Sequence, residues 1–297
     1  MNSDLLQAIK SGSVSLDDLL IHEKHISEVD PSNFKVETIG CGFPSLDEYK
    51  FLKKERSELI IVGARPSMGK SAFMFQLAYN IARELPVHIF SLEMDKESIV
   101  GRLIAAHLNK SMTSIQDGRV SDEELIKGHR ELSSLHYYID DRGGLNIDEL
   151  CESAIQANIR HNTKLLVIDY LQLIQGRGDG NRNQEIGNIT RSLKALAKEL
   201  KIPILVGAQL NRACEIRGSQ SGDFRPILSD LRESGDIEQD ADLILFLHRQ
   251  SRYDKTRPGE VDLIIAKNRN GAVGEITMNF TEQQTKFIDL KANKGYF

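Results

Sequence analysis

The chain has 297 residues, which is enough to bury a substantial core in one main domain with a smaller appendage. Its 38 Lys and Arg residues against 43 Asp and Glu residues give a net charge of -5, which argues against a protein that coats nucleic acid by positive charge alone. The sequence lacks a signal-peptide core, an apolar run of the roughly 18 residues that span a bilayer, and cysteines at metal-ligand or disulfide spacing. We therefore expect a cytoplasmic protein without a membrane partner.

The first part of the chain has the pattern of a short helical appendage. Ser15 precedes an amphipathic run with the spacing of a capping box, which predicts the start of a helix. Pro31, followed by Ser32 and Asn33, is typical of a boundary between two segments. We expect a helical linker or appendage in residues 1–34 and the main domain in residues 35–297.

A phosphate-binding loop follows the apolar run from Leu59 to Val62. The next residues read GARPSMGKS and fit the pattern G-x-x-x-x-G-K-[ST], except that Ala64 stands at its first glycine. Such a loop closes its backbone N–H groups on phosphate oxygens at the N-terminus of a helix. Lys70 would reach the β- and γ-phosphates, and the Ser71 hydroxyl would complete a Mg²⁺ shell. The pattern predicts that a nucleoside triphosphate and Mg²⁺ are bound by Ala64, Arg65, Pro66, Ser67, Met68, Gly69, Lys70 and Ser71.

Further apolar, β-rich runs alternate with longer helix-like segments along the chain. The runs cover residues 87–92, 165–168, 204–206, 243–247 and 261–266. Because they are continuously apolar, we expect strands covered on both faces in a mainly parallel α/β sheet flanked by helices. Asn270 and Gly271, with shorter runs nearby at 276–280 and 287–290, predict antiparallel hairpins at the C-terminal edge.

Polar residues follow three of these runs at the point where each predicted strand ends. Glu93, Asp169 and Gln209 occupy these positions. Ligands of parallel sheets lie at the carboxyl ends of the strands, so the three side chains should lie near the phosphates. Asp169 fits an acid on the metal side, Glu93 fits a base that orients the attacking water, and Gln209 fits a sensor of the γ-phosphate.

Two cations follow the run at 261–266. Lys267 and Arg269 stand two positions apart, so both project from one face if the strand continues. Two interpretations remain open at this point. The pair is either a solvated edge or an anion clamp for a phosphate, which could be bound on another subunit.

Taken together, seven short motifs resemble the motor domain of DnaB-type replicative helicases over residues 35–292. They stand in the order of the family and cover Arg65–Lys70, Ser91–Met94, Ile168–Ile174, Gln209–Arg212, Ser229–Gly235, Ile237–Asp242 and Lys267–Gly271. The resemblance implies a RecA-like P-loop ATPase fold, a homo-hexameric ring, and ATP-driven 5′ to 3′ movement on single-stranded DNA that unwinds a duplex.

The resemblance also implies roles for individual residues. Glu93 would be the catalytic base, and Gln209 would link the state of the γ-phosphate to the DNA-binding loops. Lys267 and Arg269 would act in trans on the nucleotide of a neighbouring subunit. By the same resemblance, the residues that line the channel and touch the DNA backbone would be Arg232, Glu233 and Gly235.

The N-terminus departs from the family pattern, because DnaB proteins carry a helical domain before a linker helix. We expect that domain to be absent here and residues 15–29 to form the linker helix. A helicase loader and primase are family partners that the sequence leaves open. Two alternatives to a helicase also remain, namely a DnaB-like accessory ATPase that assembles with or regulates another helicase, and a RecA-like recombination ATPase.

Overall fold

The computed structural model describes residues 37–178, 181–231 and 235–291. From Thr38 onward these residues belong to one compact unit. The helix predicted within residues 1–34 lies outside the described residues, so the domain division stays a prediction. No helix in the described ranges is both long enough and apolar enough to cross a membrane.

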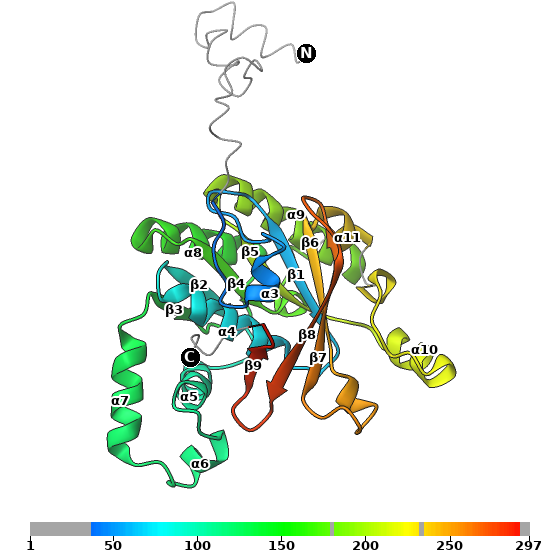
Figure 1. The fold of residues 1–297 in the computed structure, drawn as a ribbon. Helices are drawn as coiled ribbons and strands as arrows, with labels where there is room; N and C mark the ends of the chain where they lie inside the picture. The colour runs from blue at the N-terminus through cyan, green and yellow to red at the C-terminus, as the bar shows by residue number, and fades with distance from the viewer. Residues whose placement is uncertain (1–36, 179–180, 232–234, 292–297) are drawn as a thin grey trace, which may run out of the picture. The chain divides into compact units, whose positions relative to one another are not determined.

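The described residues form one nine-stranded sheet in the order β3-β2-β4-β5-β1-β6-β7-β8-β9 (Figure 1). The strands from β1 to β6 pair in parallel, and β7, β8 and β9 extend the sheet in antiparallel fashion. The strands are β1 (Leu59–Ala64), β2 (Val87–Ser91), β3 (Tyr137–Asp140), β4 (Leu165–Asp169), β5 (Ile204–Gln209), β6 (Leu243–His248), β7 (Glu260–Asn268), β8 (Gly274–Thr281) and β9 (Lys286–Asp289).

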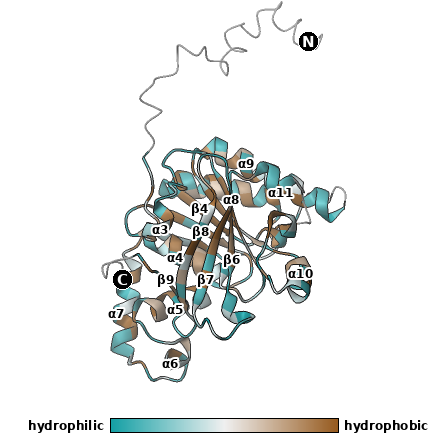
Figure 2. Cartoon of the chain, turned by 45° about the vertical axis from the view of Figure 1, so that its right-hand side comes forward, coloured by the Kyte–Doolittle hydropathy of each residue, from teal (hydrophilic) through white to brown (hydrophobic). Residues whose placement is uncertain are grey.

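Helices cover both faces of the sheet, which explains the continuously apolar strands. In β1, Ile60 and Val62 pack on the side of α4, whereas Leu59 and Ile61 pack on the side of α8, α9 and α11. Figure 2 shows brown apolar strands between helices with teal polar surfaces. The helices are α3 (Pro44–Asp47), α4 (Lys70–Ala82), α5 (Lys96–His107), α6 (Met112–Gln116), α7 (Asp122–Ser133), α8 (Ile147–His161), α9 (Arg182–Leu200), α10 (Ala213–Ser221) and α11 (Gly235–Asp240), with short 3₁₀ turns η3 (Leu171–Leu173), η4 (Leu228–Leu231) and η5 (Gln250–Arg252).

The predicted fold class, a mainly parallel sheet with antiparallel hairpins at its C-terminal edge, is confirmed. The run at 261–266 becomes β7, the first strand of these hairpins, and the turn at Asn270 and Gly271 joins it to β8. The short connection from β6 to β7 contains only η5, and a parallel pairing would need a crossover of a dozen or more residues. The sequence analysis missed β3, an edge strand whose four residues are all half-buried.

Candidate active site

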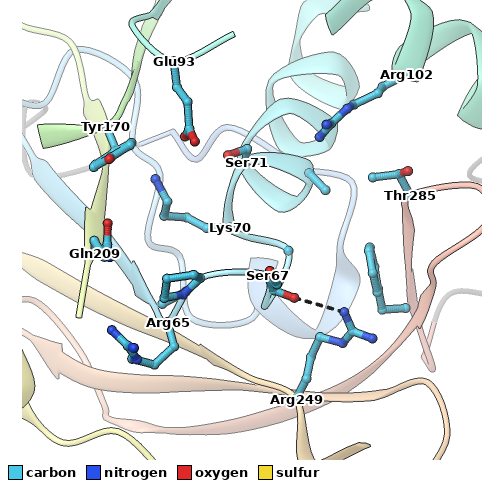
Figure 3. A pocket seen from close by; sticks show the side chains of 15 residues that line it. Arg65, Ser67, Lys70, Ser71, Glu93, Arg102, Tyr170, Gln209, Arg249 and Thr285 are labelled. Carbon is cyan, nitrogen blue, oxygen red and sulfur yellow. Dashed lines mark hydrogen bonds between the residues drawn. The ribbon is translucent and has the colours of Figure 1, made fainter. Parts of the chain in front are cut away.

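A cavity of about 350 Å³ opens at the carboxyl edge of the parallel strands, where ligands of such sheets bind. Figure 3 shows side chains around this cavity that come from the phosphate-binding loop and α4, from the ends of neighbouring strands, and from α5. The lining residues are Ala64, Arg65, Pro66, Ser67, Gly69, Lys70, Ser71, Ala72, Glu93, Arg102, Tyr170, Gln209, Arg249, Phe280 and Thr285. The cavity therefore brings together Lys70, Ser71, Glu93 and Gln209, which the sequence analysis singled out.

The phosphate-binding loop has the backbone geometry of an anion site. Gly69 is the N-cap of α4 and has a φ of 97°, a left-handed conformation that glycine adopts without strain. Because this cap has no side chain, the first N–H groups of α4 keep their capacity to bind an anion. Ser67 also has a positive φ, of 63°, so the loop folds back tightly before the helix begins.

Two departures at the start of the loop have packing explanations. Ala64 is the last residue of β1 and is buried, so its methyl group lies where the pattern has a glycine without obstructing the turn. A Cβ at Gly63 would lie 2.8 Å from Cδ1 of Phe246, so this glycine serves close packing instead. Met68 does not face the cavity, because its side chain is only 4% exposed in the core and its N–H donates to the Arg65 carbonyl.

Lys70 and Asp169 form the polar centre of the site. Lys70 Nζ donates to Asp169 Oδ1 at 2.5 Å and lies 4.1 Å from the ring centroid of Tyr170. Asp169 ends β4 at 0% exposure, and no described residue is a hydrogen-bond partner of its Oδ2. Burial lowers the pKa of Lys70, while the charges of Asp169 and Glu93 oppose that shift. A buried carboxylate oxygen without a partner is costly, so Oδ2 keeps an unused capacity to accept a bond, although Asp169 lies behind Lys70 and not among the residues that line the cavity.

The space for this ion pair depends on a glycine that the sequence analysis did not single out. A Cβ at Gly207 of β5 would lie 2.7 Å from Lys70 Nζ and 2.9 Å from Asp169 Oδ1. A larger residue would therefore displace the pair. The unpartnered Asp169 oxygen, the Lys70 ammonium and the Ser71 hydroxyl fit the predicted triphosphate with Mg²⁺, since hard oxygen ligands and phosphate oxygens suit that ion.

Glu93 and Gln209 reach the cavity from the ends of β2 and β5. Both side chains are exposed, and in Figure 3 the Glu93 carboxylate points toward Lys70 and Ser71. The backbone of Gln209 is held by Gln172, whose amide donates to the Gln209 carbonyl at 3.1 Å and accepts from its N–H at 3.1 Å. The side chain of Gln209 thus projects into the cavity from a fixed backbone.

Arg249 is a site residue that the sequence analysis missed. It follows β6, is 5% exposed, and donates from Nη1 to the Ser67 carbonyl at 3.3 Å. Its guanidinium pairs with Glu282 and lies 4.8 Å from the Phe280 ring centroid, and its buried Nε has no partner in the part of the chain that the structure describes. Arg249 directly follows the last residue of β6, so an inspection of the polar residues at the end of this strand, as was done for β2, β4 and β5, includes it.

Arg65 belongs to the phosphate-binding loop, but its guanidinium is directed toward α10. Its Nε and Nη2 donate to the two carboxylate oxygens of Glu215 at 3.0 and 3.1 Å, and its Nη1 donates to the Leu210 carbonyl at 2.7 Å. The side chain is 11% exposed. Three of its donors are therefore already used within the protein.

Lys267 and Arg269 lie at the opposite edge of the sheet. Arg269 donates to Asp242 Oδ1 at 3.1 Å and to the Gln239 carbonyl, and Lys267 donates to the Glu238 carbonyl. Asp242 in turn bonds to the first residue of β1, Leu59. Arg269 thus lies near the first residue of β1, whereas the cavity lies at its last residue, Ala64. These two residues are five steps apart, or about 17 Å at ~3.3 Å per step, so Arg269 does not reach the cavity of its own chain.

The predicted DNA contacts lie mostly outside the described structure. Arg232 and Glu233 fall in the gap between residues 231 and 235, and Gly235 begins α11. Their assignment to DNA binding stays a prediction.

The chain is similar to proteins of one family. A model of the DnaB-like helicase C-terminal domain matches residues 38–289. The replicative DNA helicase DnaC of Bacillus subtilis (strain 168) is 40% identical over 262 residues, which cover 85% of this chain and 57% of that protein. Two solved structures superpose with a TM-score of 0.80 at 31% identity. The ATPase domain of G40P matches over 98% of this chain and 100% of its own, and a DnaB-like replicative helicase, described with its interactions with primase, matches over 97% and 71%.

Proposed function

This chain belongs to the family of DnaB-like helicase C-terminal domains and has their RecA-like ATPase fold, and from that membership we propose that it is the motor of an ATP-dependent replicative DNA helicase. The chain spans 57% of the length of the Bacillus subtilis relative, so its activity, substrates and partners are stated here as proposals. In this proposal ATP is hydrolysed at the interfaces of a hexameric ring that moves 5′ to 3′ along single-stranded DNA.

One observation carries the ATPase part of the proposal. The Lys70 ammonium is held beside Asp169, directly behind the phosphate-binding loop, and Asp169 keeps a buried oxygen without a partner among the described residues. In this arrangement Lys70 would contact the β- and γ-phosphates of a bound nucleotide, and Ser71 and Asp169 would hold Mg²⁺. The bound Mg²⁺ would neutralise charge that develops on the phosphates.

Glu93 supplies the base of the proposed reaction. Its carboxylate is exposed and points into the cavity, so it can accept a proton from a water that attacks the γ-phosphate. Gln209 projects into the same cavity from the end of β5 and fits a contact that changes when the γ-phosphate leaves.

The position of Arg269 supports the proposal that hydrolysis needs two subunits. In its own chain, Arg269 and Lys267 contact the last turn of α11 at the amino edge of the sheet, far from the cavity. Arg269 is half exposed, so it could exchange its contact with Asp242 for the nucleotide of a neighbour that packs against this edge, with Lys267 beside it. Charge from an arginine in trans commonly raises phosphoryl-transfer rates by roughly 10³ to 10⁵.

The proposal extends to DNA and to partners. Contact with the DNA backbone is assigned to Arg232, Glu233 and Gly235, which suits a protein without excess positive charge because a ring repeats each contact. Primase is proposed as a partner because one similar solved helicase is described with its interactions with primase.

The first test is ATP hydrolysis by the 297-residue chain over a wide range of protein concentration, with and without single-stranded DNA. We expect specific activity to rise steeply with concentration and to increase further with DNA, because the sites form between subunits. Activity that is independent of both concentration and DNA would contradict the proposal. The Lys70→Ala variant provides the background rate.

A further inference from the structure

A bulge in β7 determines which face of the sheet carries the two cations at its end. The pairing of β6 with β7 shifts register between Ile244 and Leu245, so Ala266 is an extra residue of β7. Lys267 therefore pairs with Ile244 on the side of α8, α9 and α11, whereas regular alternation would put it on the α4 side with Leu245. The bulge thus directs the end of β7 toward α11.

Both cations then meet the C-terminal end of α11. The Lys267 ammonium donates to the Glu238 carbonyl, and Arg269 Nη2 donates to the Gln239 carbonyl at 3.2 Å. Cations are favoured there because the last carbonyls of a helix carry partial negative charge. In Figure 1 the turn between β7 and β8 lies at the same end of the sheet as α11. The Arg269 side chain is nevertheless 52% exposed, so it can also meet a group outside its own chain.

The turn that carries Arg269 is closed by one side chain. Asn268 Oδ1 accepts from the Asn270 N–H at 3.2 Å, and its Nδ2 donates to the Ala272 carbonyl at 3.1 Å. A Cβ at Gly271 would lie 2.7 Å from that Nδ2, so glycine leaves room for the amide. Both bonds lie within the turn, so they set its shape and not its place on the molecule.

A further contact ties this turn to the start of β1. Asn270 Nδ2 donates at 3.0 Å to Oε1 of Glu58, the residue directly before β1. Glu58 is 7% exposed, its Oε1 also accepts from Lys53 Nζ at 3.0 Å, and its carbonyl accepts from the Ile204 N–H at 2.8 Å. A bond to a carboxylate is stronger than one between neutral groups. The exposed turn is therefore anchored to a buried carboxylate beside a central strand of the sheet.

We propose that Asn270 and Glu58 are positioning residues that hold this turn so that Arg269 is directed at the nucleotide of a neighbouring subunit. This inference rests on the proposed function, in which Arg269 acts in trans. A contact with that nucleotide would replace the bond of the Arg269 side chain to Asp242, whereas the bond from Asn270 to Glu58 is independent of it. A backbone that is held in advance lowers the entropic cost of placing the guanidinium.

The test separates the two surfaces that one copy contributes to two sites. In the first mixture, each variant also carries Lys70→Ala and is mixed with Arg269→Ala, so hydrolysis requires the variant's Arg269. In the second mixture, each variant also carries Arg269→Ala and is mixed with Lys70→Ala, so hydrolysis requires the variant's Lys70. The steady-state ATPase rate of each mixture is compared with that of Lys70→Ala mixed with Arg269→Ala.

We expect Asn270→Ala and Glu58→Leu each to lower the rate of the first mixture by about tenfold or more, because a small misplacement of a catalytic charge is costly. The second mixture should keep its rate, since the phosphate-binding loop is untouched. The double variant should lose no more than either single variant, because both substitutions remove the same bond. A general loss of stability or assembly would lower both mixtures alike.

Two further variants accompany these. Glu58→Gln keeps an amide oxygen that accepts from Asn270, so it should retain most of the rate of the first mixture and guards against a folding defect in Glu58→Leu. The matched control is Lys53→Met, which removes the other donor to Glu58 Oε1 and leaves the bond from Asn270 in place. It should keep the rates of both mixtures.

Several results would overturn the inference. An unchanged first mixture with Asn270→Ala would show that the bond does not position Arg269, and equal losses in both mixtures would show a general defect. Losses that multiply in the double variant, or an equal loss in Lys53→Met, would assign the effect to something other than this bond. In each case, activity of Lys70→Ala mixed with Arg269→Ala leaves the proposed function intact, whereas an inactive mixture overturns the action of Arg269 in trans itself.

Discussion

The two edges of the parallel sheet each hold a buried aspartate beside a lysine, but the two carboxylates differ in how completely they are bonded. At the amino edge, Asp242 accepts from Arg269 through Oδ1, and from Leu59 N–H and Lys194 through Oδ2. At the carboxyl edge, Asp169 has Lys70 on one oxygen, and the described residues offer nothing to the other. The bonded carboxylate joins β1, β6 and α9, whereas the incompletely bonded one is poised for a ligand.

This difference separates stability from activity. Leaving a buried acceptor without a partner costs about 1 to 3 kcal/mol, and a site that binds Mg²⁺ recovers that cost when it is loaded. Both oxygens of Asp242 already accept hydrogen bonds, so neither is left for a ligand. Arg269 takes part in both edges. Within its own chain it bonds to Asp242 at the amino edge, but its proposed role is at the active site of a neighbouring subunit.

The largest expected effect tests this double role of Arg269. Arg269→Ala and Lys70→Ala should each lose hydrolysis by roughly 10³-fold or more alone, because each removes charge stabilisation from the site. Mixed together, the two variants should regain hydrolysis at interfaces that combine an intact Lys70 with an intact Arg269. The measurement is the steady-state ATPase rate of the mixture.

The control for that experiment is Lys194→Met, which weakens the bonding of Asp242 but leaves Arg269 in place. It should lower stability while the folded protein keeps its hydrolysis rate. A mixture of the Arg269 and Lys70 variants that stays inactive would place Arg269 outside the neighbouring site.

The next effect concerns the base at the carboxyl edge. Glu93→Gln should lower kcat by about 10² to 10⁴ with ATP affinity nearly unchanged, because the amide keeps the shape but cannot accept a proton. Stopped-flow binding and steady-state hydrolysis separate the two quantities. Glu97→Gln, an exposed substitution in the first turn of α5, should behave as the unmodified chain does. Full turnover in the Glu93 variant would exclude it as the base.

A pair of isosteric substitutions tests the comparison of the two aspartates directly. Asp242→Asn should lower the free energy of unfolding by about 2 kcal/mol, because Lys194 and the half-exposed Arg269 lose the buried carboxylate that they share. Asp169→Asn should cost less than about 1 kcal/mol, because only Lys70 loses a charged partner and the change also removes the charge of a buried carboxylate whose Oδ2 has no partner among the described residues, yet it should abolish hydrolysis. Chemical denaturation gives both values, and equal costs would contradict the assignment.

The last prediction concerns His88 in β2, which lies between the two edges and affects stability only at acid pH. Burial lowers its pKa from 6.5 to about 4, and neither ring nitrogen finds a partner within the described ranges. Between these values the unfolded chain binds more protons, so stability should fall by up to about 3 kcal/mol as the pH falls from 6.5 to 4. His88→Phe should flatten that part of the stability–pH curve. A curve that keeps its slope would assign the pH dependence to another group.

Much of the site was predictable because parallel strands place their ends on one edge. Glu93, Asp169 and Gln209 lie far apart in the sequence, yet each follows an apolar run, and the sheet brings these ends beside the loop. The same reasoning applied to the run at 243–247 points to His248, and the cavity residue Arg249 lies one position further on. Edge strand β3 escaped because four half-buried residues give no continuous apolar run.

Other features depend on contacts between distant segments and leave no local pattern. The requirement for glycine at position 207 arises only once Lys70 and Asp169 approach β5 from two different elements. The direction of Arg65 is set by Glu215, 150 positions away, so the loop pattern alone suggested a phosphate ligand. Pairs of residues this far apart in the sequence can be recognised only once the fold is known.

The placement of Lys70 and Arg269 on opposite edges determines how many complete active sites an assembly of copies contains. With Arg269 acting in trans, a complete site belongs to a contact between two copies, and the two surfaces of that contact are different. An open row of copies then always has one complete site fewer than it has members. Closing the row into a ring adds a site without adding a copy, so ring closure itself would register as a gain in hydrolysis per copy.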